Sequence, residues 1–207
     1  MQPEKVVEVG CMRGTLARVY LETHPHCVWH GIDIDPENIE HAKKVCTEGY
    51  LANIEQMTDL ELRHFSNADT WIFGDVLEHL YDPWKLLDRI KLNAVNDFNI
   101  VACIPNSQHW SFQARINSGM MQYEDDGFFD RTHIRFFSRL TIIDMFLKAG
   151  FDIESMFSRV IGFQGSEKYM PHIRAMAQVS GMDPEQAEND AMVFQYVVHA
   201  KHTHPRR

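Results

Sequence analysis

The sequence predicts a doubly wound α/β fold, with a mostly parallel sheet that ends in an antiparallel strand. Three observations favour this class: strand and helix patterns alternate from the N-terminus onward, the strand patterns are short continuous apolar runs, and strand patterns close the chain. Continuous apolar runs are typical of parallel strands covered on both faces. Alternating strands and helices indicate crossover connections within one such sheet.

The expected strands are short and follow one another along the whole chain. They cover residues 6–9, 27–33, 50–52, 70–73, 99–104, 151–157 and 194–200. The last two are the closing strands, and the others alternate with helices. In sheets of this kind a ligand binds beyond the carboxyl ends of the strands, near the point where the strand order reverses.

Helices are expected at 15–21, 37–46 and 84–92, and a fourth carries an apolar stripe. Three helices open with an Asp-Pro pair, at 35–36, 82–83 and 183–184. Aspartate caps free backbone amides, and proline at the first helical position loses no hydrogen bond. Gly150 is placed to end the fourth helix. The stripe of that helix consists of Leu140, Ile143, Phe146 and Leu147.

Length and composition predict one domain. The chain has 207 residues, of which 44% are hydrophobic and 24% charged, which is typical of a globular domain with a sizeable core. The polar, helix-prone segment at about 162–190 is expected to be a helical insertion or cap. Because the first strand begins almost at once, the sequence is also compatible with a domain cut from a longer multidomain protein.

Charge and cysteine content exclude several classes of protein. The net charge of −9 makes nucleic acid an unexpected partner, because an acidic domain repels phosphate backbones. No apolar run reaches the roughly 18 residues of a membrane span, and the first residues show no signal peptide. We therefore expect a cytoplasmic protein with reduced thiols. Its four cysteines show no CxxC spacing: Cys11, Cys27, Cys46 and Cys103.

The segment Glu8-Val9-Gly10-Cys11-Met12-Arg13-Gly14 links the first strand to the first helix. Glycines there permit a sharp turn and the close approach of a ligand, although a plain packing turn is the alternative. A dinucleotide site requires G-x-G-x-x-G around a pyrophosphate. Met12 stands where the middle glycine would be, and the carboxylate of Glu8 would repel a pyrophosphate but suits an ammonium group. The loop therefore points to S-adenosylmethionine.

Two further strand ends fit that donor. Asp33 ends the second strand, where a carboxylate can grip a ribose diol. A solvated strand-end carboxylate is the alternative for Asp33, while the neighbouring Asp35 fits better as a helix cap. Asn53 follows the third strand, where its amide can contact an adenine edge or simply form a turn.

Five blocks of sequence resemble the class I S-adenosylmethionine-dependent methyltransferases. The first three are EVGCMRG at 8–14, GIDIDP at 31–36 and DVLEHLYDP at 75–83. The blocks IPNSQHWS at 104–111 and FDRTHIRFFS at 129–138 are similar to a subgroup found beside, or fused to, glycosyltransferases of surface-glycan assembly. The resemblance runs from about residue 6 to residue 153, and Met12 departs from the glycine that is usual in the first block.

The resemblance implies a Rossmann-like class I methyltransferase fold and a donor site. With the residues discussed above, it assigns to the donor Glu8, Gly10, Cys11, Met12, Gly14, Asp33, Ile34, Asn53, Asp75 and Val76.

The expected reaction is methyl transfer to a sugar hydroxyl of a glycan or nucleotide sugar, with S-adenosylhomocysteine as product. It is an in-line displacement in which the protein aligns the acceptor and removes its proton. The base candidates at strand ends are Asp75, His79, His109 and His133. Each has a structural alternative: Asp75 can orient a histidine or only form hydrogen bonds, His79 can buttress the loop, and His109 and His133 can be packed residues.

The predicted acceptor site consists of Asn106, Trp110, Arg131 and His133, with Trp110 placed to stack on a sugar face. Asp75 and Asn106 together could hold a magnesium ion, but two oxygen ligands make a thin site, so a divalent metal is the less favoured alternative.

Two other functions stay open. One is an O- or C-methyltransferase for small molecules of quinone or polyketide type, since the fold is shared. The other is a non-catalytic module that binds S-adenosylmethionine or a partner protein, which Met12 in the donor loop would fit. A glycosyltransferase in the same polypeptide or pathway is the expected partner.

Overall fold

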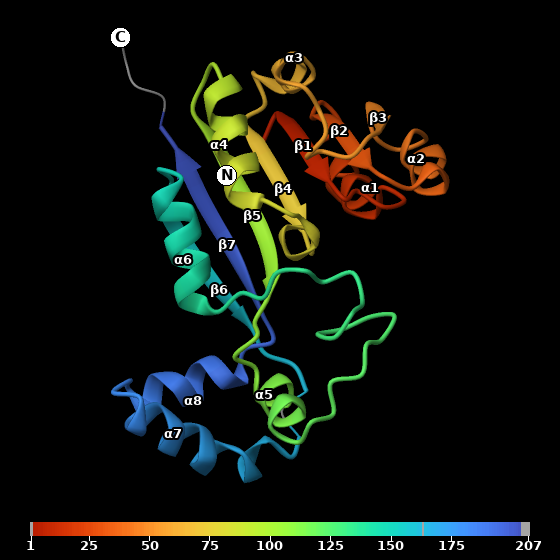
Figure 1. The fold of residues 1–207 in the computed structure, drawn as a ribbon. Coiled ribbons are helices and arrows are strands. Elements are labelled where there is room, and N and C mark those ends of the chain that lie inside the picture. The colour runs from red at the N-terminus through yellow and green to blue at the C-terminus, as the bar shows by residue number, and fades with distance from the viewer. Residues whose placement is uncertain (1, 163, 204–207) are drawn as a thin grey trace.

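The computed structural model describes residues 2–162 and 164–203, and its strands form one sheet with the order β3-β2-β1-β4-β5-β7-β6 (Figure 1). Strands β1 to β5 are parallel, whereas β7 is antiparallel to both neighbours, β5 and β6. The predicted fold class is confirmed. The bounds are β1 Lys5–Val9, β2 Val28–Asp33, β3 Glu48–Leu51, β4 Thr70–Gly74, β5 Phe98–Pro105, β6 Asp152–Arg159 and β7 Gln195–His202.

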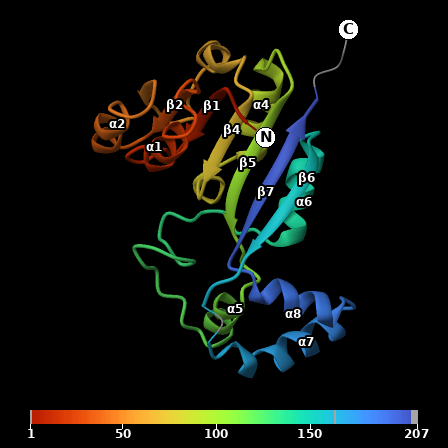
Figure 2. The ribbon, with the colours of Figure 1, turned by 180° about the vertical axis from the view of Figure 1, so that it is seen from behind.

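Helices cover both faces of the sheet (Figures 1 and 2). Helices α4 and α6 pack on the face that holds the larger core, and α1 and α2 pack on the other face, against β1 and β2. No helix of the described residues is long and apolar enough to cross a membrane. The helices are α1 Thr15–Leu21, α2 Pro36–Ala42, α3 Asp59–Leu62, α4 Pro83–Asn93, α5 Trp110–Asn117, α6 Arg139–Lys148, α7 Met170–Val179 and α8 Pro184–Met192, with short 3₁₀ turns η1 Arg63–Phe65, η2 Leu77–His79 and η3 Ser166–Lys168.

The expected helix starts are confirmed at all three Asp-Pro pairs. The carboxylates of Asp35, Asp82 and Asp183 each accept a hydrogen bond from a backbone amide in the first turn of α2, α4 and α8. Helix α2 ends at Ala42 rather than at Cys46, because the chain continues in tight turns in which amides bond to carbonyls three residues back. The Asp-Pro pairs thus set where these helices begin.

The apolar stripe expected on α6 is partly wrong. Leu140 and Leu147 are about half exposed, so the helix is turned from the expected orientation. Gly150 adopts a positive φ of 81° just past the helix, as a helix-ending glycine does. The face packed on the sheet consists of Ile142, Met145 and Phe146.

Helices α7 and α8 follow β6 and precede β7 in the chain, and they lie beyond the carboxyl end of β5 (Figure 1). They bury a small apolar cluster of their own around Met170, Ile173 and Ala191. The guanidinium of Arg139, at the start of α6, pairs with the buried carboxylate of Asp190 in α8 at 2.9 Å. This ion pair ties α8 to α6, which packs on the sheet.

Candidate active site

The loop between β1 and α1 has a left-handed backbone at Gly10, Met12 and Gly14, and at Gly10 it leaves no room for a side chain. The amides of Gly10 and Cys11 both donate to the carbonyl of Ile32, at 2.8 and 3.1 Å. A Cβ added at Gly10, whose φ is +70°, would lie 2.6 Å from Cγ2 of Val76. Met12 has a φ of +47°, so this methionine adopts the backbone that favours glycine. The loop therefore keeps a glycine-type path despite the substitution.

A cavity of about 520 Å³ opens at the carboxyl ends of β1, β2 and β4, where the strand order reverses. This is where ligands bind in open α/β sheets. Seven of the predicted donor residues line it: Gly10, Met12, Asp33, Ile34, Asn53, Asp75 and Val76. We therefore call it the cofactor cavity. Residues that were not predicted complete the wall, among them Ile54, Glu55, Leu80, Tyr81 and Thr132.

The carboxylate of Asp33 is buried at the cavity and hydrogen bonded to its surroundings, so it is not a solvated strand-end carboxylate. Its Oδ2 accepts from the amide of Met12 at 2.8 Å, and its Oδ1 accepts from the amide of Asp35 at 2.9 Å and from the side chain of Asn38 at 3.4 Å. A carboxylate offers about four acceptor positions. Asp33 thus fixes the loop at Met12 and retains capacity for a ligand hydroxyl.

Three predicted donor residues lie outside the cavity wall, which corrects their assignment. Neighbouring side chains of a strand face opposite sides, and Glu8 faces away from the cavity. Its carboxylate accepts from the indole of Trp29 at 2.9 Å, and burial raises its pKa to about 7. Cys11 is buried beside Cys46, and Gly14 caps α1 with a φ of +76°.

Asp75 is held at the cavity in a strained backbone conformation. Its φ is +54°, in the left-handed region that few residues other than glycine adopt, although aspartate is among those few. Its Oδ1 accepts a hydrogen bond from the side chain of Gln195, whose carbonyl in turn accepts from Arg159 at 2.6 Å. Desolvation is the largest effect on the pKa of Asp75 and raises it above its usual range. Gln195 comes from β7, and no motif in the sequence marks it.

His79 and His133 come together although they lie 54 positions apart in the chain. Their ring centroids are 4.7 Å apart. His79 also lines the cofactor cavity, and its neighbour Glu78 is buried, which raises the pKa of Glu78 to about 8. The amides of Ile134 and Arg135 both donate to the backbone carbonyl of Glu78 at 3.0 Å, and these bonds hold the loop at 118–138 in place.

Asn106 cannot serve the acceptor or a metal, which corrects its predicted role. Its side chain is completely buried. Its Nδ2 donates to the carbonyls of Asp190 and Val193, both at 2.8 Å, and its Oδ1 accepts from the amide of Gln108 at 3.0 Å. Asn106 instead joins the end of β5 to the end of α8.

The side chain of Trp110 also contacts other parts of the fold instead of the predicted acceptor site. Its ring stacks on Tyr169, with centroids 5.2 Å apart, and its indole N–H donates to the carbonyl of Gly162 at 3.2 Å. Trp110 borders neither the cofactor cavity nor the trough around His133. It packs α5 against the α7 segment, so the predicted stacking on a sugar is not supported.

His109 is a capping residue of α5, which corrects its assignment as the general base. Its ring accepts from the amide of Ser111 and lies 2.9 Å from the hydroxyl of that residue. Phe128 and Phe194 contact it at centroid distances of 5.3 and 5.5 Å. Burial lowers its pKa to about 4, so the ring is neutral. His109 does not line the cofactor cavity.

We expect His109→Ala to destabilise the protein and to leave donor binding intact. Loss of a helix cap costs about 0.5–2 kcal/mol, and removal of a buried ring adds to this cost. Urea unfolding measures the loss, and calorimetry with S-adenosylhomocysteine measures the affinity. The exposed His172→Ala is the matched control. Unchanged stability combined with lost turnover would restore His109 as the base.

An open trough of about 620 Å³ lies beside His133. The predicted acceptor residue Arg131 lines it, and its guanidinium pairs with the carboxylate of Asp125 at 2.8 Å. Tyr123 and Phe136 expose 69% and 54% of their surface there. The predicted acceptor residues Arg131 and His133 thus share one surface, whereas Asn106 and Trp110 lie elsewhere.

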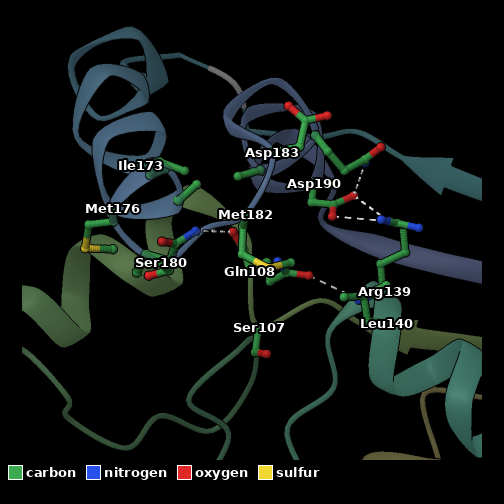
Figure 3. Close-up of a pocket in the computed structure, with 14 residues that line it drawn as sticks. Ser107, Gln108, Arg139, Leu140, Ile173, Met176, Ser180, Met182, Asp183 and Asp190 are labelled. Carbon is green, nitrogen blue, oxygen red and sulfur yellow. Dashed lines mark hydrogen bonds and ion pairs between the residues drawn. The ribbon is translucent and has the colours of Figure 1, made fainter.

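A separate cavity of about 410 Å³ lies between the start of α6 and helices α7 and α8 (Figure 3). Ile173 and Met176 from α7 line it, and Gln108, Arg139 and Asp190 form its polar wall. Among the described residues that line it, none also borders the cofactor cavity. The trough shares no described lining residue with the cofactor cavity either, but its His133 contacts His79 in the wall of that cavity, at a centroid distance of 4.7 Å.

Known proteins share this fold. Residues 1–156 match the model of a family described as a methyltransferase domain. No curated protein matches the chain in sequence. The plantazolicin methyltransferase BpumL, solved in complex with S-adenosylhomocysteine, has a TM-score of 0.63 at 14% identity, covering 98% of this chain and 77% of that chain.

Two further solved structures are similar in fold at comparably low identity. A SAM-dependent methyltransferase from Archaeoglobus fulgidus has a TM-score of 0.62 at 18% identity, covering 96% and 86% of the two chains. The magnesium protoporphyrin IX methyltransferase from Synechocystis PCC 6803, with bound S-adenosylhomocysteine, has a TM-score of 0.58 at 13% identity, covering 96% and 74%.

The sheet order and the cavity at its strand ends define an α/β enzyme of the class I methyltransferase type. The chain belongs to the methyltransferase domain family, and S-adenosylmethionine is the donor expected from its sequence. The cavity fits this donor, since it combines a buried carboxylate at Asp33 with a backbone at Gly10 that leaves no room for a Cβ.

Proposed function

We propose that this methyltransferase acts on a sugar hydroxyl of a glycan or nucleotide sugar. The observation that carries the proposal is the trough beside His133. Exposed aromatic side chains gathered at a groove mark a ligand surface, and Tyr123 and Phe136 expose their rings there. Arg131 supplies polar contacts at the same surface. The two histidines lie between this trough and the cofactor cavity.

The donor site in this proposal follows the cavity wall. Asp33 binds the ribose hydroxyls, because its carboxylate has acceptor capacity left at a buried position. Ile34, Ile54 and Leu80 supply apolar surface for the adenine, and Asn53 lies at its edge.

Asp75 acts as the general base in this proposal. S-adenosylmethionine supplies a methyl group that its sulfonium charge has already activated. A sugar hydroxyl has a pKa far above neutrality, so its proton has to be taken up as the new oxygen–carbon bond forms. Asp75 lies at the cavity wall, and its raised pKa makes its carboxylate a stronger base than an ordinary aspartate.

The test is methyl transfer from labelled S-adenosylmethionine to a panel of free sugars, nucleotide sugars, phenols and quinones. We expect transfer to sugars and a raised KM in Tyr123→Ala and Phe136→Ala. Phe157→Ala is the matched control, because its ring is 64% exposed on β6 and does not border the trough. Transfer to phenols or quinones without any sugar would contradict the proposal. The glycosyltransferase partner stays a prediction that neighbouring coding sequence can test.

A further inference from the structure

We propose that Glu78, His79 and His133 bind a divalent transition metal between the cofactor cavity and the acceptor trough. One ligand atom from each residue lies within 4.8 Å of the others. Two residues belong to η2 and the third to the loop at 118–138, so the site joins segments that are distant in the chain. The acceptor role of this metal rests on the proposed function, whereas its binding does not.

The carboxylate of Glu78 is the first independent sign of a cation site. The residue is 1% exposed, and neither of its carboxylate oxygens has a hydrogen-bond partner among the described residues. A buried carboxylate without partners is costly. Asp75 and Asp130 also act electrostatically on Glu78, so three carboxylates share this region. A bound cation would give the carboxylate of Glu78 a partner and favour its ionised form.

The tautomers of His79 and His133 are the second sign of a cation site. Nδ1 of His79 lies 3.2 Å from the carbonyl of Thr132, and Nδ1 of His133 lies 3.3 Å from the carbonyl of Phe128. A carbonyl oxygen only accepts, so Nδ1 donates in both rings. The hydroxyl of Thr132, 3.0 Å from Nδ1 of His79, fits this direction because it donates its own proton to Asp130. In the neutral form of each ring, Nε2 is then the nitrogen with a free lone pair. Histidines that bind metals are held in this way by their second nitrogen. Nε2 of His133 faces Oε1 of Glu78 at 4.0 Å.

The ligand set selects the class of metal. Two imidazoles and one carboxylate suit Zn²⁺, Mn²⁺ or Fe²⁺, whereas Mg²⁺ and Ca²⁺ prefer oxygen ligands. Bond lengths of about 2.0–2.2 Å require the three ligand atoms to approach by roughly 1 Å. Because three protein ligands leave coordination positions open, the metal can bind an exogenous oxygen.

The position of the site indicates that this oxygen is the hydroxyl of the acceptor. His79 lines the cofactor cavity and His133 lines the trough. A hydroxyl bound to the metal would be held where donor and acceptor meet. Metal binding lowers the pKa of such a hydroxyl, and the released proton passes to Asp75, the base of the proposed reaction.

The test is calorimetric titration of the chelator-treated protein with Zn²⁺. We expect one Zn²⁺ per chain, much weaker Mg²⁺ binding, and visible absorption bands when Co²⁺ is added. Glu78→Gln and His133→Ala should weaken Zn²⁺ binding at least about 100-fold. His172→Ala, an exposed histidine on α7, should bind Zn²⁺ like the unaltered protein.

Binding of S-adenosylhomocysteine by each variant shows that it is folded. Absence of stoichiometric Zn²⁺ binding would overturn the proposal, as would unchanged binding in a folded His133→Ala. These readouts do not depend on the sugar assay. Failure of the sugar assay therefore contradicts the proposed function and leaves the result for the metal site standing.

Discussion

Asp33→Asn is expected to weaken binding of S-adenosylmethionine and S-adenosylhomocysteine about 100-fold. Hydrogen bonds to a charged group contribute about 1.5–3 kcal/mol each. Loss of the charge that we propose binds the ribose diol therefore amounts to about 3 kcal/mol, or two orders of magnitude in Kd. Both carboxylate oxygens of Asp33 accept from backbone N–H groups, Oδ2 from Met12 at 2.8 Å and Oδ1 from Asp35 at 2.9 Å. The side-chain NH₂ of asparagine would therefore oppose one of these two donors. Calorimetry with S-adenosylhomocysteine measures the effect directly.

Asp35→Asn is the matched control for this experiment. Asp35 lies two residues further on and caps α2 through its Oδ1, which accepts from the amide of Glu37 at 2.7 Å. Asparagine caps helices as well as aspartate does, so we expect affinity to stay within about twofold. Equal affinities of the Asp33→Asn variant and the unaltered protein would remove Asp33 from the donor site.

The fold could be predicted from sequence because its signals are local. Apolar runs mark the strands, and the Asp-Pro pairs mark the helix starts, where Asp35 and Asp183 cap as expected. The donor cavity was predictable for a related reason, since the carboxyl ends of parallel strands meet at one edge. Gly10, Asp33 and Asp75 all line it.

Side-chain direction is what the sequence does not reveal. Asn106 and His109 follow the end of β5, as catalytic residues often do, yet both turn into the packing between β5, α5 and α8. Part of the packing around them comes from far along the chain: Asp190 accepts from Asn106 across 84 positions, and Phe194 contacts His109. Gln195 supports Asp75 from a similar distance.

The histidine cluster illustrates the same limit. His79 and His133 were both recognised as candidates, but each only by itself. Their contact depends on how the loop at 118–138 folds back onto η2, through the hydrogen bonds of Ile134 and Arg135 to Glu78. An adjacent Glu-His pair after a strand is the signal in the sequence that would have pointed to Glu78 as a ligand.

Glu8→Gln is expected to stabilise the protein above neutral pH and to change little in acid. Burial raises the pKa of Glu8 from 4.5 to about 7. The folded state therefore favours the protonated acid. Between about pH 4.5 and 7 the unfolded chain loses the Glu8 proton while the folded protein keeps it, so the free energy of unfolding falls across this range. At 1.36 kcal/mol per pKa unit the penalty at pH 8 is about 3 kcal/mol.

Glutamine removes this penalty, because it carries no charge and can still accept from the indole of Trp29, which now donates to Glu8 at 2.9 Å. The measurement is the free energy of urea unfolding of both proteins at pH 5 and pH 8. Other titrating groups cancel in the difference between the two proteins. We expect this difference to grow by roughly 2–3 kcal/mol between the two pH values in favour of Glu8→Gln. A difference that does not depend on pH would mean that Glu8 ionises at its ordinary pKa in the folded protein.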